Sequence, residues 1–274
     1  TTATTKVNSF DADGFSHGSH GANNNQNKQN IAWGWKAGEG TTTSGATTGS
    51  GTAKTFTRSV NTAGGFSIIG YVGNGTSGHT IPHGLTAAPN FVIAKKRDSI
   101  DDFIVFHSNG GGNATTTYRG ILSSNATFIA DSGGYWANAI PDATNVSLGG
   151  NAHTNVNNEN LIMYCWHAVS GVSAFGSYSG TAAAQTITYA NSSSFTAKFI
   201  MIKQINTTRN WFMVDGFRDS GRWTKYLYLD VNNAEGDENS FGVTPTSTGF
   251  SFTSADNGTL INQSGGTYIY IAFA

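Results

Sequence analysis

The chain has 274 residues, which is enough for one large all-β domain or for two ordinary domains. Its 15 Lys and Arg residues against 16 Asp and Glu residues give a net charge of −1, so the surface lacks the excess positive charge that attracts nucleic acid or anionic lipid. No stretch approaches the ~18 consecutive apolar residues of a membrane-spanning helix. We therefore expect neither nucleic-acid binding nor membrane insertion.

The composition predicts an all-β protein. Glycine accounts for 35 residues, and Ser, Thr and Asn make up about a third of the chain, whereas only 11% of residues are charged. The aromatic content of 12% supplies large side chains for a core, and Thr, Val, Ile and aromatic residues suit a pleated, half-buried surface. A single cysteine excludes an intramolecular disulfide, so stability has to come from packing.

Residues 1–37 are predicted to be the last third of a repeat unit. Their strings SFDADGFSHGS and IAWGWKA resemble TPTSTGFSFTS and YIYIAFA at the end of the chain. A few strands cannot bury a face alone, so we expect that the polypeptide continues upstream of Thr1 or that these strands add to a neighbouring unit or subunit. Residues 38–64 are predicted to be a Gly/Ser/Thr-rich linker, covering 38–54, followed by a lead-in strand at 55–60.

Two complete units are predicted to follow, at 65–170 and 171–274. The string FVIAK, which begins at Phe91, returns as FIMIK, and LIMYCWHA, which begins at Leu161, returns as TYIYIAFA, at a spacing of about 106 to 108 residues. This alignment places Tyr164 of the first unit at the same position of the last strand as Tyr270 of the second unit and as Trp33.

Each unit is predicted to be a β-sandwich of the jelly-roll type, because seven or eight short strands in ~106 residues are typical of that architecture. Apolar or alternating runs separated by Gly, Asn, Ser and Asp turns mark seven strands in the middle unit, at 66–72, 90–96, 102–107, 118–122, 127–130, 145–149 and 160–167.

Two pairs of residues have spacings that invite a chemical interpretation. His79 and His83 could bridge a metal ion, but the aligned positions of the next unit are not histidine and Pro82 marks a turn, so we expect a loop. Cys165 and His167 point to the same face of a strand, but a nucleophile pair needs a third, orienting group. We expect Cys165 to be a buried structural thiol.

Two segments resemble parts of calcium-binding loops, residues 11–14 and 230–239. Neither has the complete twelve-residue ligand pattern, so the sequence favours turns and leaves calcium binding open. The adjacent Asp101 and Asp102 would point to opposite faces of a strand, and no acid/base pair recurs in both units. We therefore predict no catalytic residues, no metal site and no cofactor, and a protein that is not an enzyme.

Aromatic side chains outside the expected strands are the remaining candidates for ligand contact. Tyr135, Trp136 and Trp223 lie in Gly/Asn/Ser-rich stretches, where an aromatic ring can stack on a sugar ring without any charge. The alternative for each of them is a place in the sandwich core. We take these three as the candidate ligand-binding residues.

Several strings carry a resemblance to a known family: DADGFSHGS, AWGWKAG, GGFSIIGYVGNGTSGHTIPHGLTAAPNFVIAKKRDS, YLYLDVNNAEG and GGTYIYIAFA. They resemble a repeat domain of unknown function in tail-fibre-like and other structural proteins of tailed bacteriophages, particularly phages of aquatic bacteria. The last unit departs from this pattern at 186–194, where TITYANSSS replaces TIPHGL. The resemblance implies a place in the virion and brings no catalytic residues with it.

The sequence thus leads us to expect a non-enzymatic structural protein of a bacteriophage virion, a tail or head fibre or related appendage on the particle surface, with host-surface glycan as a ligand. A homo-oligomer is expected, a trimer by the resemblance, in contact with other virion proteins. The alternatives are a capsid decoration protein, or a carbohydrate-binding module or depolymerase of a secreted or virion enzyme. A carboxylate pair in a groove would favour the enzyme, and an apolar patch for self-association would favour decoration.

Overall fold

The computed structural model describes residues 6–11, 14–21, 24–38, 40–112, 116–190, 193–237, 242–253 and 260–274. In these ranges the ordered elements are β-strands, apart from the single helical turn α1 (Ala152–Asn155). No described helix is long and apolar enough to cross a membrane. The chain divides into two compact units, a smaller unit Thr1–Trp35 and a larger unit Lys36–Ala274.

The smaller unit contains one described hairpin. Strand β1 (Val7–Asp11) pairs with antiparallel β2 (Gly14–His17), and Phe10 lies opposite Phe15. Both strands are exposed along their length. The prediction of a strand around Trp33 is wrong, because residues 31–37 form no strand. A strand needs a neighbouring strand to pair with its N–H and C=O groups along its length.

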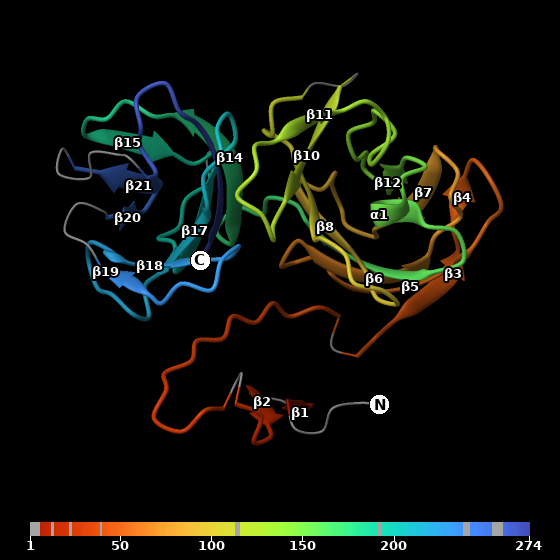
Figure 1. The fold of residues 1–274 in the computed structure, drawn as a ribbon, viewed down its shortest axis with the longest axis horizontal. Coiled ribbons are helices and arrows are strands. Elements are labelled where there is room, and N and C mark those ends of the chain that lie inside the picture. The colour runs from red at the N-terminus through yellow and green to blue at the C-terminus, as the bar shows by residue number, and fades with distance from the viewer. Residues whose placement is uncertain are drawn as a thin grey trace. The chain divides into compact units, whose positions relative to one another are not determined.

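The first sandwich of the larger unit comprises β3 to β13 (Figure 1). Its main sheet has eight strands in the order β11-β10-β9-β8-β13-β6-β5-β3, and a second sheet has the order β12-β7-β4. All pairs are antiparallel. The strands are β3 (Thr43–Ala46), β4 (Thr48–Gly49), β5 (Thr55–Asn61), β6 (Phe66–Val72), β7 (His79–Pro82), β8 (Phe91–Lys96), β9 (Ile104–His107), β10 (Thr117–Ile121), β11 (Ile129–Asp131), β12 (Asn145–Leu148) and β13 (Asn160–Trp166).

The second sandwich comprises β14 to β22. Its main sheet has six strands in the order β14-β22-β16-β17-β18-β19, and its second sheet has the order β15-β21-β20. The strands are β14 (Ser173–Ser179), β15 (Gln185–Thr188), β16 (Phe199–Gln204), β17 (Trp211–Asp215), β18 (Lys225–Tyr228), β19 (Gly236–Asp237), β20 (Thr244–Thr246), β21 (Gly249–Phe252) and β22 (Thr267–Phe273).

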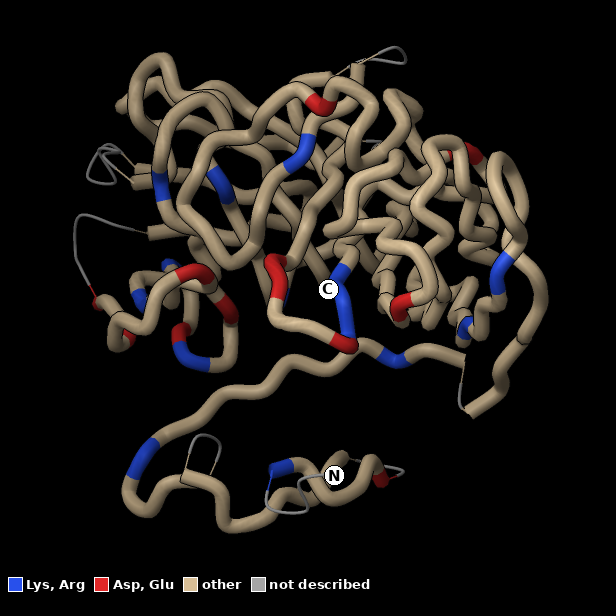
Figure 2. The backbone as a smooth tube through the Cα atoms, turned by 45° about the vertical axis from the view of Figure 1, so that its right-hand side comes forward, with Lys and Arg blue, Asp and Glu red and all other residues tan. Residues whose placement is uncertain are grey.

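The prediction of an all-β protein built from sandwiches is confirmed. All seven strands predicted in the middle unit form, and their ends agree with the predicted ends to within two residues. Each sandwich has its own core, to which both of its sheets contribute. Strand β7 corrects the expectation of a loop at His79, because the chain there pairs with β12 and β4. Charged residues are sparse and scattered over the chain (Figure 2).

Six strands of the two main sheets follow the same order, β6-β13-β8-β9-β10-β11 in the first sandwich and β14-β22-β16-β17-β18-β19 in the second, and the first adds β5 and β3. In the first, the last strand β13 lies between β6 and β8; in the second, the last strand β22 lies between β14 and β16. Two buried tyrosines mark equivalent positions, because the Tyr71 hydroxyl donates to the Thr154 carbonyl at 2.6 Å and the Tyr178 hydroxyl donates to the Ile261 carbonyl at 2.6 Å. Tyr71 therefore corresponds to Tyr178.

This correspondence corrects the predicted alignment of the last strands. Leu161 lies opposite Tyr71 and Tyr268 lies opposite Tyr178, so Leu161 corresponds to Tyr268. Counting along the strands, Tyr270 then corresponds to Met163 and not to Tyr164. The predicted alignment is wrong by one residue, and in a strand one residue exchanges the two faces of the sheet. Tyr270 is 1% exposed in the core, whereas Tyr164 is partly exposed on the opposite face.

The predicted linker at 38–54 is also corrected, since it contains β3 and β4. Strand β3 pairs with β5 at the edge of the main sheet, and β4 pairs with β7. Between them Thr47 is buried, where its hydroxyl oxygen accepts from the Lys54 N–H at 2.8 Å and lies 2.7 Å from His79 Nε2. A Gly/Ser/Thr-rich composition describes a flexible linker only when no neighbouring strand pairs with it.

Aromatic side chains and a docked loop join the two sandwiches. Phe91 of the first sandwich stacks on Phe175 of the second with ring centroids 6.4 Å apart, and Trp166 contacts Phe273 at 6.5 Å. The loop after β10 lies on the second sandwich, where Arg209 N and Lys203 Nζ donate to Asn125 O at 3.0 and 3.3 Å and Phe128 N donates to Ile205 O at 3.0 Å. Trp211 Nε1 also donates to Ile121 O at the end of β10 at 2.9 Å, and His107 Nε2 of β9 donates to Tyr270 O at 3.2 Å.

Candidate functional site

Of the three predicted ligand-binding residues, Tyr135 is the one with a partly exposed side chain. It is adjacent in sequence to Trp136, which is 1% exposed and packs in the first core, with its ring 6.1 Å from that of Phe106. The prediction that Trp136 contacts a ligand is therefore wrong. The two neighbours point in different directions because the backbone turns sharply at this place.

The turn is held by one carboxylate. Asp131 accepts hydrogen bonds from the N–H groups of Tyr135 at 2.9 Å and Trp136 at 2.6 Å. Gly133 has a φ of +89°, which a side chain would strain, and a Cβ atom on Gly149 would lie 2.0 Å from the carbonyl oxygen of Gly134. The Gly-rich composition of this stretch thus serves a tight backbone approach that presents Tyr135 at the surface.

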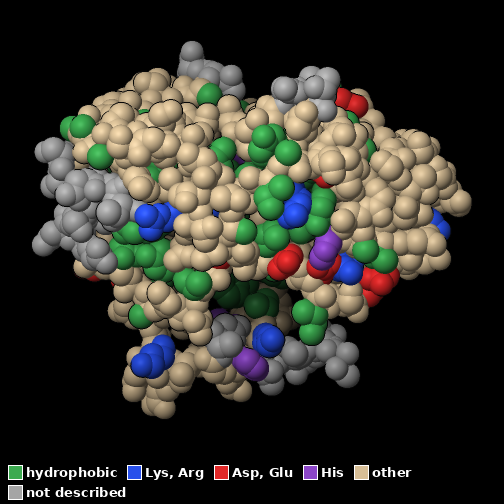
Figure 3. All heavy atoms as spheres, turned by 45° about the horizontal axis from the view of Figure 1, so that its top comes forward, with side chains coloured by type: hydrophobic (Ala, Val, Ile, Leu, Met, Phe, Trp, Pro, Cys, Tyr) green, Lys and Arg blue, Asp and Glu red, His purple; other side chains and the backbone are tan. Residues whose placement is uncertain are grey.

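Tyr135 is the centre of a group of five side chains, which we call the Arg119 cluster: Lys96, Asp101, Arg119, Tyr135 and His153. The Arg119 guanidinium carbon lies 4.3 Å from the centre of the Tyr135 ring, within cation–π distance. The His153 ring is nearly parallel to the Tyr135 ring, at an angle of 13° and a centroid distance of 5.8 Å. Figure 3 shows one face of the molecule, on which basic, acidic, histidine and apolar side chains gather.

Asp101 connects the other members of the cluster. Its carboxylate contacts His153 Nδ1 and forms an ion pair with Lys96 Nζ at 3.0 Å, and its side chain is only 5% exposed. Burial raises the pKa of the Asp101 carboxyl, but hydrogen bonds from the Asp102 N–H, Lys96 and His153 outweigh burial, so the net pKa lies below its usual value. The carboxylate is therefore charged and accepts from His153 Nδ1–H, which leaves Nε2 as the other nitrogen of this 40%-exposed side chain.

The cluster belongs to the first sandwich alone. From the strand register, Lys96 corresponds to Gln204, Asp101 to Arg209, Arg119 to Tyr226 and His153 to Leu260. Tyr226 is 4% exposed, and Leu260 packs against the second core. Since the second sandwich folds with none of these four side chains, the common fold does not require them.

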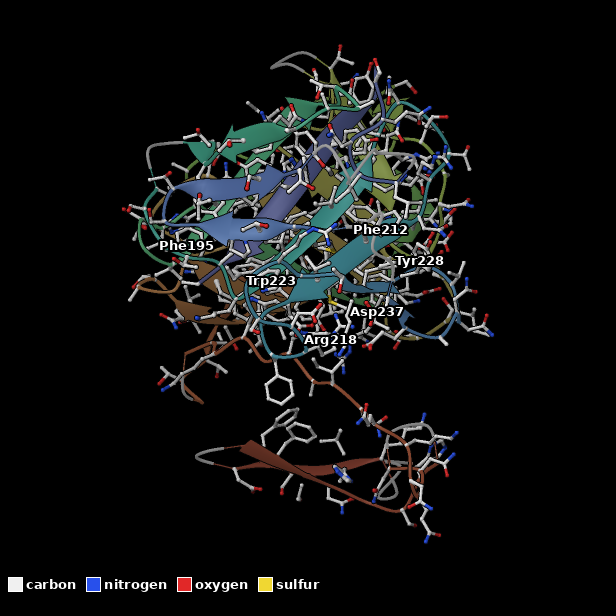
Figure 4. The ribbon with its side chains drawn as sticks, turned by 90° about the vertical axis from the view of Figure 1, so that its left-hand side faces the viewer. Phe195, Phe212, Arg218, Trp223, Tyr228 and Asp237 are labelled. Atoms are coloured by element: carbon white, nitrogen blue, oxygen red, sulfur yellow. The ribbon has the colours of Figure 1, made fainter. Side chains whose placement is uncertain are left out.

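Trp223, the third predicted ligand-binding residue, is buried in the second sandwich. It is 4% exposed and belongs to a core that also contains Phe195 and Phe212 (Figure 4). The prediction of ligand contact by Trp223 is therefore wrong. A large aromatic ring in a Gly-rich stretch is compatible with either a surface or a core position, and only the packing of the two sheets decides between them.

The carboxylates near Trp223 are occupied by local contacts. Asp215 forms an ion pair with Arg218 at 2.7 Å, and Arg218 also contacts Glu235 at 2.7 Å. Asp237, labelled in Figure 4, accepts from the Thr224 hydroxyl at 2.9 Å. The last residues of the possible calcium loop at 230–239 lie outside the described residues, as does Asp13 of the possible loop at 11–14. In the described ranges no group of three His, Cys, Asp or Glu side chains could hold a metal ion.

The remaining candidate residues are buried. His79 Nδ1 lies 2.8 Å from the Asn155 side-chain oxygen, and His83 Nε2 lies 3.1 Å from the Asp142 carbonyl oxygen. Burial lowers the pKa of both imidazoles, which are therefore neutral structural groups.

Cys165 is fully buried in the first core, and burial raises the pKa of its thiol, as expected for a structural cysteine. His167, which follows the end of β13, has other partners: its Nε2 lies 3.2 Å from the Thr86 hydroxyl, and its Nδ1 lies 2.9 Å from the Ala168 carbonyl.

The fold defines the chain as an all-β protein with two tandem sandwiches and a short N-terminal unit. By its sequence it belongs to the family of the domain of unknown function DUF7483, whose model matches residues 1–274. Comparison with curated proteins and with solved structures finds no match.

The sequence analysis missed four of the five members of the Arg119 cluster. Asp101 was considered only as half of a carboxylate pair with Asp102, and Lys96, Arg119 and His153 were not singled out. One signal was available in the sequence: charged residues of one repeat unit align with uncharged or oppositely charged residues of the other. Using it requires the correct register, and a shift of one residue would have compared Arg119 with the wrong residue.

Proposed function

We propose that the protein is a non-enzymatic structural protein of a bacteriophage virion, forming part of a tail or head fibre or a related surface appendage. The observation that carries this proposal is the fused interface between the sandwiches. Ring contacts such as Phe91 with Phe175, and the docked loop at Asn125, bury aromatic surface and tie the two domains into one block. A stiff array of β-domains suits a protein that projects from a particle.

The chemistry of the surface supports the same role. Only 11% of the residues are charged, and the exposed strands are rich in Thr, Ser and Gly. Such a surface is compatible with close packing of several chains, so the proposal includes a homo-oligomer, with a trimer expected from the resemblance, and contacts to other virion proteins. Many copies would add avidity to weak binding at each site.

A test is to locate the chain in intact phage particles by cryo-electron microscopy combined with labelling by an antibody against the larger unit. The proposal expects label on an appendage, in a number of copies that matches the symmetry of that appendage. Label confined to the capsid lattice would instead identify a decoration protein, and absence from the purified particle would overturn the proposal.

The non-enzymatic part of the proposal has a separate test. The protein is incubated with host-surface polysaccharide, and the reducing ends released are measured against a boiled control. No release is expected, because Asp101 and Asp215 are held in ion pairs and Asp237 accepts a hydrogen bond from Thr224, whereas glycoside cleavage needs two carboxylates facing each other across the sugar. Release above the control would favour the depolymerase alternative.

A further inference from the structure

We propose that the Arg119 cluster is a binding site for a carboxylate-bearing sugar, such as a uronic acid residue of a surface polysaccharide. The inference rests on the adhesive role included in the proposed function and names the ligand class and the residues. It does not involve Trp136 or Trp223, which are buried.

The first argument is the state of the Arg119 guanidinium. Its described contact is the face of the Tyr135 ring, and no described carboxylate lies within ion-pair distance of it. The ring holds the planar group in place, while its N–H groups remain available for a ligand. A guanidinium donates two parallel hydrogen bonds to a carboxylate, which makes Arg the residue best suited to that group.

The second argument is the orientation of His153. Asp101 engages Nδ1, so Nε2 is the ring nitrogen of this 40%-exposed side chain that is left for a ligand. A sugar hydroxyl can form a hydrogen bond with that nitrogen while the sugar carboxylate receives hydrogen bonds from Arg119. Both groups contact Tyr135: the Arg119 guanidinium lies over its ring, and the His153 ring is nearly parallel to it.

The third argument is the comparison with the second sandwich. There, a buried Tyr226 replaces Arg119 and Leu260 replaces His153. The same fold therefore forms in the same chain with uncharged side chains at these two positions. Desolvating a carboxylate at Asp101 and ordering long cationic side chains is costly without further benefit, and ligand binding supplies a reason to keep them at the surface.

The test uses the full chain and a short oligogalacturonate as the probe, with its carboxyl-reduced neutral counterpart as the control ligand. Isothermal calorimetry and the chemical shifts of the His153 ring protons report binding. The unaltered protein is expected to bind the charged oligomer at least about tenfold more tightly than the neutral one, and to bind it more weakly as salt is added. Equal affinity for the two oligomers, or no binding, would overturn the inference.

Substitutions then locate the site. Arg119→Ala is expected to reduce the affinity about tenfold or more, whereas Arg97→Ala, which removes the same charge from an exposed loop of the same sandwich, is expected to leave it unchanged. Equal losses in both variants would show a general charge effect and overturn the assignment to Arg119. The comparison of ligands on the unaltered protein does not depend on how the variants fold. If the chain is found in an appendage but does not bind the charged oligomer, only this inference fails.

Discussion

The two sandwiches of the larger unit are alike inside and different outside. In the first, the buried Asn155 side chain accepts from the Asn74 N–H at 2.9 Å and donates to the Thr76 carbonyl at 2.9 Å. In the second, the buried Asn262 accepts from the Thr181 N–H at 2.9 Å and donates to the Ala183 carbonyl at 2.8 Å. In both networks the asparagine oxygen accepts from a backbone N–H and the asparagine nitrogen donates to a backbone carbonyl two residues further along the chain.

At the surface, by contrast, the Arg119 cluster of the first sandwich is replaced by Gln204, Arg209, Tyr226 and Leu260 in the second. The comparison separates two requirements. Buried polar groups that close the ends of the sheets are kept in both copies, because leaving them unpaired is costly, while surface positions are free to take on a function in one copy.

The largest expected effect comes from breaking the shared network. Asn155→Ala removes the partners of the Asn74 N–H, of His79 and of the Thr76 and Gly149 carbonyls at once. We expect the free energy of unfolding to fall by about 3–5 kcal/mol, measured by urea denaturation.

Two further variants control this prediction. Asn262→Ala is expected to destabilise the second sandwich to a similar extent, and Asn157→Ala, at an exposed neighbouring position, should have no measurable effect. A destabilisation of Asn155→Ala below about 1 kcal/mol would contradict the role given to the network.

The next effect concerns pH and the interface between the sandwiches. His107 is 2% exposed, its Nδ1 accepts from the Asn109 N–H, and its Nε2 donates to the Tyr270 carbonyl of the other sandwich. Burial lowers its pKa to about 4, against the opposing effect of the hydrogen bond to Tyr270. Between pH 6.5 and 4 the unfolded chain takes up a proton that the folded chain excludes.

Stability is therefore expected to fall as the pH drops from 6.5 towards 4, by at most about 3 kcal/mol from this group. His79 and His83, whose pKa values are also lowered, act in the same direction. The measurement is the pH dependence of the unfolding free energy. In the variant His107→Gln the slope over this range should be smaller, and an unchanged slope would show that His107 does not contribute.

A smaller effect is expected in the segment first interpreted as a linker. Thr47→Val removes the hydroxyl that bonds the Lys54 N–H and His79 Nε2, and should cost about 1–3 kcal/mol of unfolding free energy. Thr52→Val, an exposed neighbour, is the matched control. If both variants are as stable as the unaltered protein, residues 43–49 behave as a linker in solution after all.

The smallest effect is expected from removing the smaller unit. Deletion of residues 1–35 should change the melting temperature of the larger unit by no more than a surface substitution would, because the larger unit is compact by itself. Differential scanning calorimetry of the two chains checks this. A clear loss of stability would mean that the hairpin β1–β2 supports the sandwiches.

The hairpin β1–β2 also shows which structural features a sequence repeat determines. Phe10 lies opposite Phe15 in β1–β2 as Pro245 lies opposite Phe250 in β20–β21, in agreement with the sequence match. Phe250 is fully buried by the second sandwich, whereas Phe15 is 44% exposed. The same local sequence forms the same local hairpin, but burial depends on the strands around it.

Local pattern was sufficient for the fold class and for the positions of seven strands in the first sandwich. Alternating and apolar runs between Gly, Asn and Asp turns predicted the seven strands from β6 to β13 other than β7, since a strand expresses its period of two and its end signals locally. The repeat itself, and the structural role of Cys165, could also be inferred from the sequence, because they depend on residue type and spacing.

Only the tertiary structure decided which faces meet. The register of β13 against β6 shows that Tyr164 does not occupy the position equivalent to Tyr270. Sequence similarity tolerates a shift of one residue, whereas the hydrogen-bonded pairing of two strands does not. The packing of two sheets placed Trp136 and Trp223 inside and left Tyr135 at the surface. The Arg119 cluster joins residues from β8, β10, α1 and two loops, and only folding brings positions so far apart in the chain together.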